Sequence, residues 1–79
     1  MILSTENFIK LSEISQSCEL EIVRGTHVIE SAQILLDSQQ EVDSMLLPYL
    51  KSIMSMYSCL HATTEHLYSI CQEIEQTNL

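Results

Sequence analysis

The sequence predicts an all-α protein, a small three-helix bundle, from three observations. One seven-residue hydrophobic register holds from Leu11 to Ile74. Glycine and proline occur once each, at Gly25 and Pro48, and are the only strong interruptions of that register. Hydrophobic residues make up 46% of the 79 residues, which is too apolar for a disordered chain and favours a single helical domain over residues 1–79.

The register is firm at its two core positions. With Leu11 at position a of the heptad, 15 of the 20 a and d positions are apolar, whereas among the ten g positions only Met45 and Cys59 are apolar. This contrast is typical of amphipathic helices with a buried stripe. Six apolar e positions widen the stripe beyond the narrow seam of a two-stranded coiled coil: Ile22, Ile29, Leu36, Leu50, Tyr57 and Cys71.

The first two helices are predicted to meet at Gly25. Ser4 or Thr5 can cap the start of the first helix, and Arg24 suits its negative carboxyl end. Gly25 then stands where a left-handed closing residue is favoured, and Thr26 can cap the second helix.

The second helix is predicted to run from about His27 to a break between residues 43 and 47. The break is placed there because Pro48 inside an undistorted helix would cost ~3 kcal/mol. The third helix begins near Pro48 and continues to about Gln76.

Two other divisions of the chain stay open. Ser38 followed by Glu41 matches a capping box, which would start the last helix earlier and leave Pro48 as a kink within it. Alternatively, one long helix can contain Gly25 at a cost of ~1 kcal/mol relative to alanine. That division gives a two-helix antiparallel hairpin that turns near Pro48.

The cysteines and the apolar segments indicate a cytoplasmic protein. Cys59 and Cys71 are too far apart on one helix to form a disulfide, about 18 Å. A disulfide from Cys18 to either of them stays sterically open, but we expect all three cysteines to be buried thiols in a reducing compartment. Residues 1–6 lack the basic start of a secretory leader. The most apolar stretch, residues 45–62, is interrupted by proline, serines and a histidine, so we expect no membrane span.

Charge and composition argue against several functions. Eleven acidic residues oppose only Lys10, Arg24 and Lys51, for a net charge of −8, so direct nucleic-acid binding is not expected. A basic protein surface remains a suitable partner. With a single glycine and no HExxH pair, the chain has neither a phosphate-binding loop nor a zinc-protease motif.

One cluster of reactive side chains, Cys59, His61, Glu65 and His66, does not fit a metal or catalytic site. Cys59 and His66 point to different sides of the helix from the pair His61 and Glu65. We therefore predict no catalytic, cofactor-binding or metal-binding residue, no cofactor, no small-molecule substrate and no enzyme.

The segment from Met45 to Leu60 carries more apolar residues than one helix of a small monomer can bury. Leu47, Met54 and Tyr68 are expected to belong to a second face that docks on another chain. The residues predicted at a partner interface are Leu47, Tyr49, Leu50, Ile53, Met54, Met56, Tyr57 and Leu60.

These features favour a non-catalytic interaction protein that packs an apolar helix face against a larger, different chain in a hetero-oligomeric assembly, with acidic rims selecting the partner. One alternative is a small chaperone that holds a helical client, such as a secretion-system component. Another is an acidic regulator that masks a basic nucleic-acid-binding protein. A self-sufficient homodimer is the third.

Overall fold

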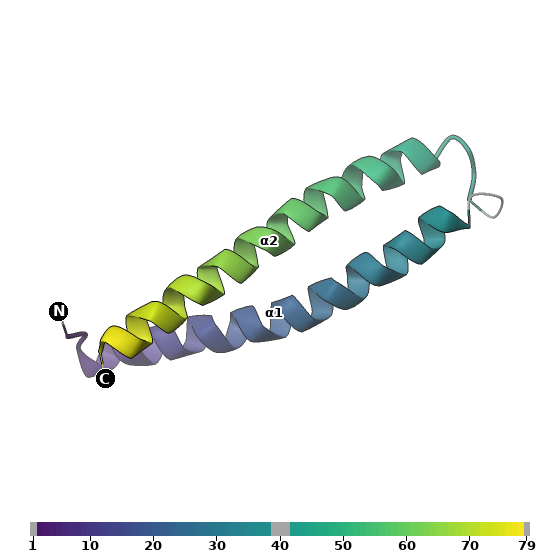
Figure 1. The fold of residues 1–79 in the computed structure, drawn as a ribbon. Helices are drawn as coiled ribbons and strands as arrows, with labels where there is room; N and C mark the ends of the chain where they lie inside the picture. The colour runs from purple at the N-terminus through teal and green to yellow at the C-terminus, as the bar shows by residue number, and fades with distance from the viewer. Residues whose placement is uncertain (1, 39–41, 79) are drawn as a thin grey trace.

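The structure is a computed structural model that describes residues 2–38 and 42–78. Two long helices, α1 (Thr5–Asp37) and α2 (Leu47–Thr77), pack side by side as an antiparallel hairpin (Figure 1). The amino-terminal part of α1 and the carboxyl-terminal part of α2 lie together, at the end of the hairpin opposite the connection between the helices (Figure 1). There the Leu3 backbone N–H donates a hydrogen bond to Asn78 Oδ1 at 2.7 Å. The hairpin alternative is confirmed, and the predicted three-helix bundle is wrong.

The predicted helix boundary at Gly25 is wrong because this residue lies inside α1 with an ordinary negative φ. Gly25 is buried on the side of α1 that faces α2, where the ring of His61 occupies the space of a side chain. Thr26 caps no helix, since its hydroxyl donates to the carbonyl oxygen of Ile22 within α1. The glycine therefore serves the contact between the helices.

The start of α1 and both ends of α2 lie where the sequence signals predict them. Ser4 is the N-cap of α1, and its Oγ accepts a hydrogen bond from the Asn7 backbone N–H at 3.2 Å. Pro48 lies in the first turn of α2, where its missing N–H would have no partner within the helix. The predicted start near Pro48 and the predicted end near Gln76 are both confirmed.

The connection between the helices shows why the chain turns before Pro48. Ser38 ends α1 and its hydroxyl donates to the Ile34 carbonyl, so the predicted capping box does not start a helix at Ser38. Its other member, Glu41, lies outside the described residues. Asp43 organises the turn into α2, because its carboxylate accepts from the Met45 N–H at 2.8 Å and its carbonyl from the Leu46 N–H at 2.9 Å.

The two helices contact each other through different heptad positions. On α1 the residues that face α2 are at a and e, and the buried ones are Leu11, Ser15, Cys18, Gly25 and Leu36. On α2 they are at b and e, where Cys71 is buried and the half-buried ones include Leu47, Leu50, Met54, Tyr57, His61, Thr64 and Tyr68. The a/d stripe of α2, expected to be buried, therefore lies mostly outside the hairpin.

The core of the hairpin is thin. None of the described side chains is completely buried, and only four hydrophobic residues count as buried: Leu11, Cys18, Leu36 and Cys71. The molecule measures 55 × 16 × 16 Å, with a radius of gyration of 17.5 Å. A compact protein of this length would have a radius of gyration of about 12 Å. The chain thus keeps much of its surface in water.

Candidate interaction surface

One side of the hairpin carries a continuous set of exposed hydrophobic side chains, which we call the apolar face. On α2 and its N-cap, Leu46, it consists of the exposed a and d residues Leu46, Tyr49, Ile53, Met56, Leu60, Leu67 and Ile70. On α1 it consists of the exposed d residues Ile14, Val28 and Leu35. Two polar d residues, Glu21 and Thr63, interrupt the pattern.

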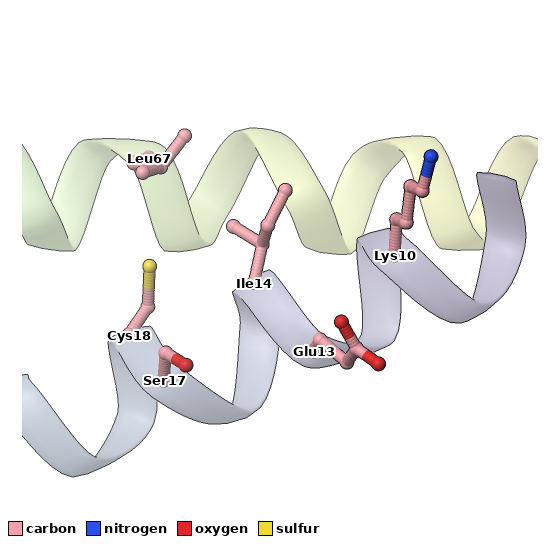
Figure 2. Close-up of a pocket in the computed structure, with 6 residues that line it drawn as sticks. All are labelled: Lys10, Glu13, Ile14, Ser17, Cys18 and Leu67. Carbon is pink, nitrogen blue, oxygen red and sulfur yellow. The ribbon is translucent and has the colours of Figure 1, made fainter.

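Grooves between the helices show that both parts of the apolar face lie on the same side. Near the chain ends, Ile14 of α1 and Leu67 of α2 line one open groove, with Cys18 directed toward α2 (Figure 2). Nearer the connection, Val28 and Ile53 line a second groove. The d row of α1 therefore follows the a row of α2 over most of the length of the hairpin.

The structure divides the eight residues predicted at the interface into two groups. Tyr49, Ile53, Met56 and Leu60 lie on the apolar face and are 63–70% exposed. Leu47, Leu50, Met54 and Tyr57 are half-buried at the b and e positions that face α1. Leu47, Met54 and Tyr68 thus do not form the expected second face, because pairing with α1 uses the side of α2 on which they lie.

Six residues of the apolar face were absent from the predicted interface: Ile14, Val28, Leu35, Leu46, Leu67 and Ile70. The heptad register marked all six as a or d residues. The sequence pattern did not show that these positions face outward, since that depends on how each helix is rotated against the other.

Both basic and acidic side chains lie near the apolar face. Lys10 and Arg24 occupy g positions of α1, next to its exposed d residues, and Lys10 and Glu13 both line the groove in Figure 2. Among the described acidic residues, one belongs to a d position, Glu21, and one to a flanking g position, Glu73. The other acidic residues of the two helices occupy b, c and f positions: Glu6, Glu13, Glu19, Glu30, Asp37, Glu65 and Glu75.

The opposite side of the hairpin holds polar contacts between the helices. Tyr68 Oη donates a 2.7 Å hydrogen bond to Glu19 Oε1. This bond, partial burial and the negative charges of Glu19 and Glu75 raise the pKa of the Tyr68 phenol above its usual value. His61 Nε2 lies 3.2 Å from Glu65 Oε1 and 3.5 Å from Thr26 Oγ1.

The three cysteines differ in exposure. Cys18 and Cys71 are buried between the helices, whereas Cys59 is exposed, which corrects the expectation of three buried thiols. Burial, followed by the nearby Cys71, raises the pKa of the Cys18 thiol. All three are free thiols.

No group of three or more His, Cys, Asp or Glu side chains within residues 2–38 and 42–78 is arranged to hold a metal ion. In the same residues, no helix combines the length and the apolarity needed to cross a lipid bilayer. Comparisons with protein-family models, with curated proteins and with solved structures gave no significant match to this chain.

Proposed function

We propose that this protein is a non-catalytic interaction subunit whose apolar face packs against helices of a larger partner chain. The observation that carries the proposal is the row of exposed hydrophobic a and d residues along α2. Within this row Tyr49, Ile53 and Met56 are 64–70% exposed although they occupy positions that normally form helix–helix cores.

The surface area of the hairpin supports this proposal. Its accessible surface is 6208 Å², whereas a compact monomer of 9.0 kDa exposes about 4,900 Å² by the usual size scaling. The difference, about 1,300 Å², exceeds the roughly 800 Å² that each partner buries in a standard protein–protein interface. Covering the apolar face would provide the burial that two helices cannot provide alone.

The length of the apolar face favours helices as the docking elements of the partner. Its residues recur at heptad spacing from Leu46, the N-cap of α2, to Ile70 within α2, and each a or d side chain of such a row can insert between side chains of a facing helix. The grooves beside Ile14 and beside Val28 offer places for side chains of the partner.

Site-specific photo-crosslinking tests the proposal in cells that naturally produce the protein. A photoreactive phenylalanine analogue is placed at Met56 on the apolar face, or at Glu30, an exposed residue of α1 outside it. We expect the probe at Met56 to give an adduct larger than two 9.0 kDa copies, and the probe at Glu30 to give none. Ile53→Glu in the Met56 background should remove that adduct. No adduct to another chain, or equal adducts from both probes, would contradict the proposal.

A further inference from the structure

We propose that, in the absence of a larger partner, a second copy of this chain covers the apolar face, so that two hairpins form a two-fold symmetric four-helix bundle. The inference rests on the proposed function only for the location of the docking face. Three observations select a second copy: the arrangement of the apolar rows, the accessible surface of the whole hairpin and the distribution of charge.

The apolar rows are placed as in one half of a four-helix bundle. On α2 the positions that face α1 are b and e, and the exposed apolar positions are a and d. At about 100° of rotation per residue, the centres of these two sets lie roughly 100° apart around the helix. In a square bundle each helix contacts two neighbours about 90° apart. The exposed side of α2 therefore points to where a neighbouring helix of a four-helix bundle would lie.

The same relation holds on α1, which makes the face suitable for pairing with itself. The a and e residues of α1 contact α2, and the exposed d residues Ile14, Val28 and Leu35 lie roughly 80° away around the helix. Both helices of one hairpin thus direct an apolar row to the same side. A two-fold axis brings this patch against its own copy.

The exposed area is sufficient for such a dimer. Each hairpin exposes about 1,300 Å² more than a compact monomer of the same mass. Two copies that buried this excess would share an interface of about 2,600 Å², within the range of obligate homodimers. A chain of this size, with four buried hydrophobic residues among those that the structure describes, gains stability by such an association.

The charge distribution permits two copies to meet on this side despite the net charge of −8. Glu21 is the one acidic residue within the apolar rows of the described helices, and Lys10 and Arg24 border the row on α1. Of the remaining acidic residues of α1, which occupy b, c and f positions, Glu13 lines the groove beside Ile14 together with the basic Lys10, and the others lie outside that groove. A strongly basic partner would find little complementary charge on this face, whereas an identical face presents apolar residues to apolar residues.

Three single substitutions on the whole chain test the inference. Ile53→Glu and Met56→Glu each replace an exposed residue of the apolar face, and Val23→Glu replaces a residue of α1 that is 70% exposed outside it. All three variants acquire the same added charge, so only the position differs. Sedimentation equilibrium over a wide concentration range gives the mass of each, and circular dichroism gives its helix content.

We expect the wild type and Val23→Glu to reach the mass of two 9.0 kDa chains. Ile53→Glu and Met56→Glu should raise the dimer dissociation constant at least about tenfold. If these variants lose helix content, a wild-type melting temperature that rises with protein concentration still supports the dimer. A wild type that stays monomeric throughout, or a Val23→Glu variant that dissociates as readily as the other two, would overturn the inference.

The two experiments distinguish a failure of the homodimer from a failure of the proposed function. If the purified chain is monomeric and the probe at Met56 still gives the larger adduct in cells, the homodimer is contradicted and the larger partner is supported. If the purified chain is dimeric and the only adduct from the probe at Met56 has the mass of two copies, the larger partner is contradicted and the homodimer is supported.

Discussion

The imidazole ring of His61 in α2 lies directly against Gly25 in α1, in the space that a side chain at this position would fill. A methyl group added at Gly25 would overlap Nδ1 of His61 and lie 2.9 Å from Cε1. Gly25 therefore allows a half-buried ring to enter between the helices midway along the hairpin. This contact explains why a helix of 33 residues retains a glycine in its interior.

Replacing Gly25 with alanine should destabilise the wild type and stabilise a variant that lacks the His61 ring. Alanine favours the helix over glycine by about 1 kcal/mol, but overlap with a packed ring costs about 1–3 kcal/mol. We expect a net loss of about 1 kcal/mol, which corresponds to a decrease of several degrees in melting temperature. In the His61→Ala background only the gain remains, so Gly25→Ala should raise the melting temperature.

Thermal unfolding of the wild type, both single variants and the double variant, all at one protein concentration, measures this coupling. Equal effects of Gly25→Ala in both backgrounds would show that the ring moves away without cost.

The fold was predictable where the signal is local. Ser4 and Pro48 mark the starts of α1 and α2 through their own hydrogen-bonding capacity, and both signals agree with the structure. Gly25 was misinterpreted because the same residue suits a helix end and a close contact between helices. Its role depends on His61, which is distant in sequence and gives no local signal.

The candidate surface was predictable in composition but not in orientation. The heptad register identified a stripe of apolar a and d residues, and Tyr49, Ile53, Met56 and Leu60 were selected from it. The sequence did not show that α2 would turn its b and e positions toward α1. That rotation depends on which side chains fit between the helices, such as Tyr68 beside Glu19.

The hydrogen bond between Tyr68 and Glu19 predicts a loss of stability in alkaline solution. Only the neutral phenol can donate to the carboxylate, and the pKa of Tyr68 is raised in the folded protein. The contribution of this bond is therefore complete below the unfolded pKa, about 10, and is lost as the pH rises through the higher folded pKa. Tyr68→Phe should melt at a lower temperature than the wild type near neutral pH and should lose less stability on the alkaline side.

Melting temperatures measured from about pH 8 to about pH 11 test this prediction. Tyr49→Phe is the matched control, because Tyr49 is 69% exposed and lies outside the contact between the two helices. Parallel loss of stability in the wild type and in Tyr68→Phe would contradict the assigned role of the bond.

The exposure of the cysteines predicts that one of the three thiols reacts rapidly with a disulfide reagent such as Ellman's reagent. Cys59 is exposed, whereas Cys18 and Cys71 are buried, and the raised pKa of Cys18 further lowers its thiolate fraction. Cys59→Ser should remove the fast phase, and denaturant should release the two slow thiols. A fast phase that persists in Cys59→Ser would show that the helices separate readily near Cys18.

The location of the acidic residues predicts how salt affects the homodimer. Two chains of net charge −8 repel each other at long range, but the acidic residues of α1 other than Glu21 lie outside its exposed apolar row. Added salt screens the repulsion and leaves the apolar contact unchanged, so the dissociation constant should fall severalfold between about 0.05 M and about 0.5 M sodium chloride. A double variant, Glu30→Gln with Glu65→Gln, reduces the repulsion and should show a weaker salt effect. Sedimentation equilibrium gives the dimer dissociation constant of the wild type and of the double variant.

A dimer that weakens as salt rises would instead mean that ion pairs join the two copies. Lys10 and Arg24 would then be the cations to replace, because both border the apolar face.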